Sequence, residues 1–212
     1  MNDTTTTTHD TTTPNHPTTT PPETTTMNDT TNNAHKTAIA RRAPSSPAKW
    51  VCGDGLWFHS SILDYGCGRS VDAEYYASQG FSARKVDPYW TSGETCYPDG
   101  KAIDDGAVEH RADYDVVTCT YVLNVIECWV DRDAVLHRIR DLLADHGTAY
   151  VAVRADVKEA HTTQRGTWQA PIRIGNTNPG KGDFMPVHEC SGFHMYELTR
   201  EDLANAYTYV AE

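Results

Sequence analysis

The chain has 212 residues and a formal net charge of −11, with 29 acidic against 18 basic side chains. A surplus of negative charge repels nucleic acid at long range, so bulk electrostatics argue against a nucleic-acid-binding protein of the usual basic kind. The length favours one domain, and no apolar run approaches the ~20 residues that a membrane-spanning helix needs.

The amino-terminal segment is dominated by threonine, with proline, asparagine and aspartate. Such a composition cannot bury enough apolar surface to offset the entropy lost on ordering. We therefore expect a disordered tail over residues 1–36 and one domain over residues 37–212. The opening Met1-Asn-Asp-Thr recurs at Met27, which leaves the translation start open. No signal-peptide pattern precedes the domain, so a cytoplasmic location is expected, in the host if the protein is viral.

The six cysteines are scattered along the chain, without a Cys-x-x-Cys pair and without the spacing of a Cys/His metal site. Zinc sites in proteins require clustered ligands of this kind. We therefore expect reduced thiols and no bound metal.

From residue 61 onwards, short apolar runs alternate with helical patterns. This order predicts a Rossmann-like, doubly wound α/β domain with a mainly parallel sheet. The expected elements are, in chain order, strand 61–64, helix 70–79, strand 81–86, strand 114–120, helix 131–145, strand 148–153, strand 192–198 and a capped helix starting at 199–203. Residues 91–113 and 155–191 lack periodicity, and the second of these segments is expected to be a functional loop or lid.

Two helices carry a predicted inner face and a predicted end. For the helix at 70–79, the residues expected to face the sheet are Val71, Tyr75 and either Ala77 or Ser78. For the helix at 131–145, they are Val135, Ile139, Leu142 and Leu143. Gly80 and Gly147 follow these segments and are expected to end the helices, since glycine readily adopts the left-handed conformation of a C-cap.

A glycine loop, Asp64-Tyr65-Gly66-Cys67-Gly68, connects the first strand to the first helix. Glycines at this point allow a tight turn and a close approach of a nucleoside cofactor to the backbone. A dinucleotide site would have a third glycine where this chain has Val71, and an acid before the loop would face a pyrophosphate unfavourably. Asp64 suits a cationic amino-acid group, and Asp87 ends the next strand, where an acid accepts hydrogen bonds from ribose hydroxyls.

The pattern therefore favours S-adenosylmethionine, which carries a sulfonium, an ammonium and two ribose hydroxyls but no phosphate. The alternatives are a dinucleotide-dependent dehydrogenase and an ordinary strand-end loop in which Asp64 and Asp87 cap nearby backbone.

The segment Ile62-Leu-Asp-Tyr-Gly-Cys-Gly-Arg69 resembles the first motif of class I S-adenosylmethionine-dependent methyltransferases, with Ser70 where many members have a further glycine. The chain more specifically resembles a bacterial and phage group of methyltransferase-like proteins associated with DNA phosphorothioation. The matching parts are Lys36-Thr-Ala-Ile39 with Arg41 or Arg42, Pro44-Ser45, Pro47, the glycine loop with Asp72, Asp87-Pro88 and Tyr121-Val-Leu-Asn-Val-Ile-Glu127.

This resemblance implies that Thr120, Tyr121 and Asn124 lie near the transferred methyl group. The residues expected to bind the cofactor are Asp64, Tyr65, Gly66, Cys67, Gly68, Asp72, Asp87, Pro88, Thr120 and Tyr121. Those expected to contact the methyl acceptor are Asn124, Arg154, Arg165, Trp168 and Gln169, in which guanidinium, indole and amide groups suit a base or an anion. No residue is assigned a catalytic role.

The acceptor is less constrained than the cofactor. Amino-directed DNA methyltransferases hold a flipped base with an Asp/Asn-Pro-Pro-aromatic motif after the strand at 114–120, where this chain has Thr118-Cys-Thr-Tyr121. Asp87-Pro-Tyr89 follows a different strand and lacks the second proline. The resemblance nevertheless favours a nucleic acid or modified nucleotide as acceptor and partner. A small-molecule acceptor and a non-catalytic, cofactor-binding subunit of a modification complex remain alternatives.

Overall fold

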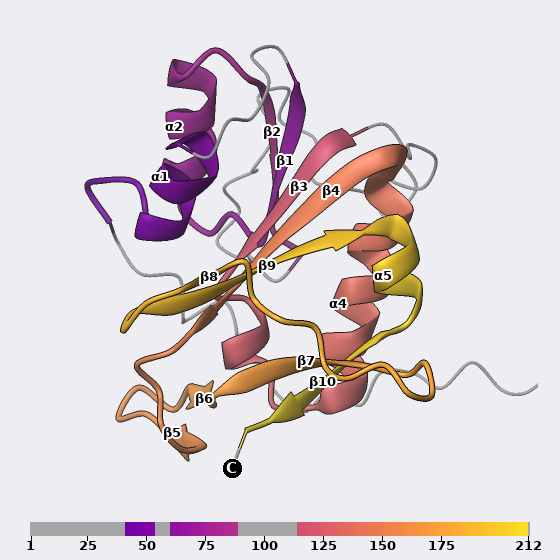
Figure 1. The fold of residues 1–212 in the computed structure, drawn as a ribbon. Helices are drawn as coiled ribbons and strands as arrows, with labels where there is room; N and C mark the ends of the chain where they lie inside the picture. Colours follow the sequence, from indigo (N-terminus) through magenta and orange to yellow (C-terminus); the bar gives the residue numbers. More distant parts are fainter. Residues whose placement is uncertain (1–40, 54–59, 89–113, 212) are drawn as a thin grey trace, which may run out of the picture. The chain divides into compact units, whose positions relative to one another are not determined.

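The computed structural model describes residues 41–53, 60–88 and 114–211. Its centre is a six-stranded sheet with the order β2-β1-β3-β4-β9-β8 (Figure 1). These strands are β1 (Ser61–Tyr65), β2 (Ser82–Val86), β3 (Tyr114–Thr120), β4 (Leu143–Arg154), β8 (His188–Glu189) and β9 (Phe193–Thr199). The first four are parallel, whereas β9 pairs antiparallel with β4 and β8 antiparallel with β9. The predicted mainly parallel sheet is confirmed.

Helices cover both faces of this sheet (Figure 1). The elements on one face are α1 (Ser46–Gly53) and α2 (Val71–Ser78), and those on the other are the 3₁₀ turn η2 (Leu123–Val125), α4 (Trp129–Leu142) and α5 (Arg200–Ala204). Neighbouring residues of one strand point to opposite faces, because the side-chain period of a strand is two. Ile62 packs in the cluster that contains Tyr76 of α2, and Leu63 packs in the cluster that contains Leu136 of α4. The domain is therefore doubly wound, as predicted.

The inner face of α2 differs from the prediction. Ala73 and Tyr76 are buried together with Asp72, whereas Ala77 and Ser78 are exposed and Tyr75 is half-buried. The buried positions Asp72 and Tyr76 lie one residue after the predicted Val71 and Tyr75, so the helix is rotated by about one residue from the prediction. The predicted end is confirmed, since Gly80 follows the helix with a φ of +94°.

The boundary between α4 and β4 also differs from the prediction. The helix ends at Leu142, Leu143 already belongs to the strand, and Gly147 lies inside β4. The pairing of β4 with β3 shifts register between Tyr114 and Val116. At this irregularity a Cβ on Gly147 would stand 2.7 Å from the carbonyl oxygen of Tyr114. Gly147 therefore allows two strands to approach closely and does not cap a helix.

The segment expected to be irregular, residues 155–191, contains three short strands besides β8. They are β5 (His161–Thr162), β6 (Trp168–Gln169) and β7 (Ile172–Asn176). The last strand of the chain, β10 (Ala206–Val210), pairs antiparallel with β7 in a two-stranded sheet. Three hydrogen bonds connect β10 to α4. Arg132 Nε donates to Thr208 Oγ1 (3.1 Å), and the N–H and the hydroxyl of Thr208 both donate to Asp133 Oδ1 (2.8 Å each).

The end of the chain confirms two predicted elements. The strand expected at 192–198 is β9, and the capped helix expected at 199–203 is α5. Thr199 Oγ1 accepts from the Asp202 backbone N–H at 3.1 Å, and Asp202 Oδ2 accepts from the Thr199 N–H at 2.9 Å, which together form a capping box. Within the described ranges, none of the helices is long and apolar enough to cross a membrane. The predicted tail over residues 1–36 and the weak segment at 91–113 lie outside the described residues.

Candidate functional site

The site predicted from the sequence lies where the strand order of the sheet reverses. β1 has β2 on one side and β3 on the other, and the chain continues from β3 to β4 in the opposite direction. In open α/β sheets, ligands bind at the carboxyl ends of the strands beside such a reversal. Nine of the ten predicted cofactor residues end or follow these strands, namely Asp64, Tyr65, Gly66, Cys67, Gly68, Asp87, Pro88, Thr120 and Tyr121. The fold therefore brings residues from three separated segments to one edge of the sheet.

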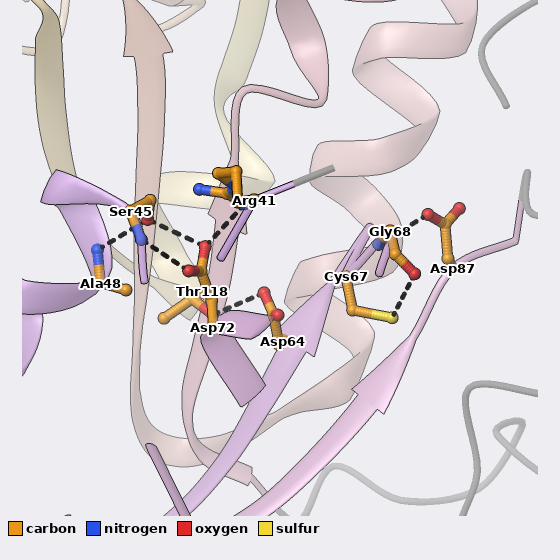
Figure 2. A network of polar contacts seen from close by, with 9 residues as sticks. All are labelled: Arg41, Ser45, Ala48, Asp64, Cys67, Gly68, Asp72, Asp87 and Thr118. Carbon is orange, nitrogen blue, oxygen red and sulfur yellow. Dashed lines mark hydrogen bonds and ion pairs between the residues drawn. The ribbon is translucent and has the colours of Figure 1, made fainter. Parts of the chain in front are cut away.

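The glycine loop is tied to the end of β2 by backbone hydrogen bonds. The N–H groups of Gly66 and Cys67 both donate to the carbonyl oxygen of Val86, at 2.7 and 3.0 Å. The N–H of Gly68 donates to Asp87 Oδ2 at 2.9 Å, as Figure 2 shows. These bonds hold the loop and the predicted ribose-binding acid in one rigid unit.

Gly66 permits a close contact between this loop and the segment after β3. It has a φ of +74°, and a Cβ at this position would stand 2.3 Å from Cγ2 of Val122. Val122 directly follows Tyr121, which itself has a left-handed φ of +64°. A left-handed conformation strains a residue with a side chain, and such strain gathers at functional sites. The Tyr121 N–H donates to the carbonyl oxygen of Ala152 at 2.9 Å, which holds this turn against β4.

Asp64 is the buried acid of the site. The residue is only 3% exposed, and its Oδ1 accepts a hydrogen bond from Thr118 Oγ1 at 3.3 Å. Its other oxygen, Oδ2, is buried without a hydrogen-bond partner among the described residues. Burial, together with the neighbouring carboxylate of Asp72, raises the pKa of Asp64 to about 7. β1 therefore carries, directly before the loop, a buried carboxyl oxygen without a hydrogen-bonding partner among the described residues.

The structure gives Asp72 different partners from those expected. Its carboxylate is buried and binds the segment before α1, as Figure 2 shows. Oδ1 accepts from the Ser45 N–H at 2.7 Å, while Oδ2 accepts from the Ser45 hydroxyl at 2.8 Å and from Arg41 Nη2 at 3.0 Å. Arg41 and Ser45 entered the sequence analysis only as matching positions of a resemblance, without an assigned role. An acid in the first turn of a helix commonly faces solvent, so its burial gave no signal in the sequence.

The Asn124 side chain is also occupied by the fold. The residue is completely buried, its Nδ2 donates to the Ala170 carbonyl oxygen at 2.7 Å, and its Oδ1 accepts from the Arg154 N–H at 2.8 Å. The amide thus connects the segment after β3 to the end of β4 and to the residue after β6. In this structure Asn124 positions Arg154.

Two other predicted acceptor residues lie together at the end of β4. Arg154 donates to both carboxylate oxygens of Asp156, at 2.9 and 2.6 Å, and its Nη1 donates to Gln169 Oε1 at 2.8 Å. The bonds to Asp156 raise the pKa of Arg154 further and lower that of the carboxylate. Arg154 and Gln169 therefore form one pre-positioned polar group beside the crevice.

The remaining two predicted acceptor residues lie apart from this group. Trp168 packs against the core, and the guanidinium carbon of Arg132 lies 5.6 Å from the centre of its ring. Arg165 is exposed in the turn between β5 and β6. In the part of the chain that the structure describes, no group of His, Cys, Asp and Glu side chains could hold a metal ion.

The chain is similar to several solved structures. A solved structure similar to this chain is a 1,6-didemethyltoxoflavin N1-methyltransferase from Burkholderia thailandensis, with 16% identity over 79% of this chain and 78% of the other, and a TM-score of 0.48. A second is a TehB-like S-adenosylmethionine-dependent methyltransferase from Corynebacterium glutamicum, with 17% identity over 72% and 86% of the two chains and a TM-score of 0.44.

Among curated proteins, the comparison gives no match to the chain. The family described as "methyltransferase domain" matches residues 32–189, which is most of the chain and includes the glycine loop, Asp87 and the segment after β3. The chain belongs to the methyltransferase-domain family and is a methyltransferase.

Proposed function

We propose that the chain transfers a methyl group from S-adenosylmethionine to a small acceptor molecule. The observation that supports the cofactor is the buried Oδ2 of Asp64, which has no hydrogen-bond partner among the described residues. Asp64 lies one residue before the end of β1, beside the glycine loop. A buried ionised oxygen is costly unless a donor or a cation meets it. The ammonium group of S-adenosylmethionine is such a cation, and family membership supports this cofactor.

The other residues around the loop fit the remaining parts of the cofactor. The glycines of the loop allow its tight turn, and Asp87 is placed to accept from ribose hydroxyls. Arg41 is one-third exposed and close enough to lower the pKa of both Asp64 and Tyr121. Its guanidinium suits the carboxylate of the cofactor.

The charges at the site argue against a dinucleotide. Asp64, Asp72 and Asp87 surround the loop, and both Asp72 and Asp87 raise the pKa of Asp64. A pyrophosphate would add two negative charges to this cluster of acids, which Coulomb repulsion disfavours most strongly where water is excluded. A ligand with an ammonium and a sulfonium relieves the same repulsion.

When bound, the cofactor supplies a methyl group on a positively charged sulfur, so that the acceptor's lone pair forms the new bond to carbon while the electrons of the carbon–sulfur bond return to sulfur. The chain's own contribution is to hold both reactants in line and to exclude water, because such a displacement depends mainly on positioning. Thr120 and Tyr121 end the central strand at the point where the two reactants would meet. Tyr121 has a left-handed backbone conformation, and its hydrogen bond to Ala152 holds it in place at this point.

A small acceptor agrees better with the charge of the chain than a nucleic acid does. A net charge of −11 opposes the approach of a polyanion, whose binding requires many phosphate contacts from Lys and Arg. The resemblance to phosphorothioation-associated proteins points to a nucleic acid or modified nucleotide, and a single nucleotide is a small acceptor of this kind. We therefore propose that the methyl acceptor is a small molecule, and the experiments below include nucleic acid as the competing acceptor.

Replacing Asp87 tests the cofactor part of the proposal. Titration calorimetry with S-adenosylhomocysteine, the demethylated product, is expected to show about 30-fold weaker binding for Asp87→Ala, because the loop loses a charged acceptor and the ribose loses its partner. Asp87→Asn keeps an acceptor for the Gly68 N–H, so its affinity for S-adenosylhomocysteine should lie between those of the original chain and Asp87→Ala. Asp141→Ala removes an exposed acid of α4 and serves as the matched control. An unchanged affinity in Asp87→Ala would show that the ribose binds elsewhere.

A further inference from the structure

A pocket of about 470 Å³ opens beside the carboxyl end of β4. Its walls are the end of β4 with the residues after it (154–158), the entry to β7 (171–173), the β8–β9 hairpin (189–194) and Ala211 after β10. This volume lies within the range of pockets that bind small molecules. The cofactor residues of β1 and β2 are not among its lining residues, so the pocket is separate from the glycine loop.

The charged residues that line this pocket are mostly basic. Arg154, Lys158 and Arg173 are the lining cations and Glu189 is the single lining acid. Arg154 is also paired with Asp156, which leaves Lys158 and Arg173 as the cations that face fewer acids. The nearest approach of Arg173 Nη1 to Glu189 Oε1 is 3.8 Å, and both side chains are more than one-third exposed, so this pair is weak. A basic pocket in a chain of net charge −11 contrasts with the rest of the molecule.

His194, which also lines the pocket, responds to this basic environment. Burial lowers its pKa, and the positive charges of Arg173 and Lys158 lower it further, whereas Glu189 opposes them. The surroundings of His194 therefore disfavour the protonated imidazole. The two cations outweigh the single acid at this position of the pocket wall.

The pocket also adjoins the expected meeting point of the two reactants. Tyr121 donates its N–H to Ala152, two residues before Arg154 on β4. Its phenol is half-buried, and its pKa is raised to about 12 mainly by burial, with electrostatic contributions from Arg41, Arg154, Asp156 and Cys190. Tyr121 is thus within electrostatic reach of Arg41 near the glycine loop and of Arg154 and Cys190 in the pocket.

We propose that this pocket binds the anionic group, a carboxylate or a phosphate, of the methyl acceptor, with Lys158 and Arg173 as its main cations and Arg154 as a fixed hydrogen-bond donor. The inference rests on the proposed function and names the class of its acceptor. Arginine suits both kinds of anion because its planar donors match their oxygens in pairs. The bonds from Arg154 to Asp156 and Gln169 pre-position its guanidinium, so little rotamer entropy is lost when an anion binds.

The test is titration of the full chain with inorganic phosphate and, separately, with malonate at constant ionic strength, followed by calorimetry. Lys158→Gln and Arg173→Gln are each expected to weaken binding about 5-fold, whereas Glu189→Gln should strengthen it by a similar factor, since a charge at the pocket wall acts through partly screened solvent. A gain of affinity cannot arise from a misfolded variant. Lys181→Gln, on an exposed loop, is the matched control.

The two anions distinguish the sources of the negative group: tighter phosphate binding indicates a phosphate ester, and tighter malonate binding a carboxylic acid. S-adenosylhomocysteine is titrated into the same samples. If S-adenosylhomocysteine binds normally while the affinities for phosphate and malonate are unchanged in the three pocket variants, the pocket inference is wrong and the proposed function stands. If S-adenosylhomocysteine itself does not bind, the proposed function is wrong. Displacement of phosphate by duplex DNA at much lower concentration would also contradict a small acceptor.

Cys190 offers an independent reading of the charge inside the pocket. It lines the pocket and is exposed, as is Cys128 at the start of α4. Iodoacetate is an anion and iodoacetamide is neutral, so the ratio of their alkylation rates reports the local potential. We expect the rate with iodoacetate divided by the rate with iodoacetamide to be higher at Cys190 than at Cys128. At Cys190 this ratio should fall in Lys158→Gln and in saturating phosphate. Equal ratios at the two cysteines, unchanged by phosphate, would contradict an anion-binding pocket.

Discussion

Gly66→Ala is expected to abolish measurable binding of S-adenosylhomocysteine and to lower the free energy of unfolding by about 3 kcal/mol. The added methyl group would stand 2.3 Å from Cγ2 of Val122, in a backbone conformation with a φ of +74°. Val122 is buried and β-branched, so its side chain has little freedom to turn away. Either the glycine loop or the segment that carries Tyr121 must move, and both border the site. Calorimetry and urea unfolding measure the two effects.

Gly166→Ala separates the clash from the backbone strain. Gly166 has the same φ of +74°, but a Cβ there meets nothing within 4 Å. The free energy of unfolding of this variant should therefore fall only by the strain of a left-handed alanine, about 1 kcal/mol, and the variant should bind S-adenosylhomocysteine normally. If Gly66→Ala kept its cofactor affinity, the contact between the glycine loop and the segment after β3 would not matter for binding.

Asp64→Asn is expected to stabilise the ligand-free chain at pH 8 and to eliminate cofactor binding. The ordinary pKa of this carboxyl is 3.8, and in the folded state it is about 7. Between these values the folded chain keeps a proton that the unfolded chain has released, so the contribution of Asp64 to stability is lost as the pH rises from 4 to 7. Above pH 7 the buried charge costs on the order of 4 kcal/mol, which asparagine avoids. Urea unfolding between pH 5 and pH 8 measures the difference.

The same residue predicts how cofactor binding depends on pH. A cationic ammonium favours the ionised carboxylate, so affinity for S-adenosylhomocysteine should rise as the pH increases through 7 and level off above it. Binding below pH 7 should release a proton, which calorimetry in buffers of different ionisation enthalpy detects. Asp141→Asn, at an exposed position, should leave stability and binding unchanged. A more stable Asp64→Asn variant that binds normally would place the ammonium group away from Asp64.

Local sequence patterns were sufficient to predict the elements that build the cofactor site. The strand before Gly66, the strand at Tyr114–Thr120 and the end of β2 at Asp87 each have a short apolar run followed by a distinct polar or glycine signal. Because the carboxyl ends of parallel strands meet at one edge, these local signals also predicted which residues come together. The cofactor site is predictable because its geometry follows from chain order.

The features that the sequence did not reveal depend on contacts between distant segments. β7 and β10 pair across about thirty residues of chain, and neither strand is long or apolar enough to be recognised alone. Asp72 is buried because Arg41 and Ser45 bind it from a segment before α1, which reversed the usual expectation for an acid in a first helical turn. The pocket walls likewise come from four separated segments, so the basic character of the pocket is visible only after folding.

Transfer of a radiolabelled methyl group tests the central claim most directly. Purified chain is incubated with labelled S-adenosylmethionine and, in parallel, with a small-molecule extract, total RNA or duplex DNA, with Gly66→Ala as the inactive control. The account predicts label in the small-molecule fraction, on a product that an anion-exchange resin retains, and none with the control variant. Label in DNA or RNA alone would contradict the proposed acceptor. Binding of S-adenosylmethionine without transfer to any of the three would contradict the proposed enzyme and leave a cofactor-binding subunit.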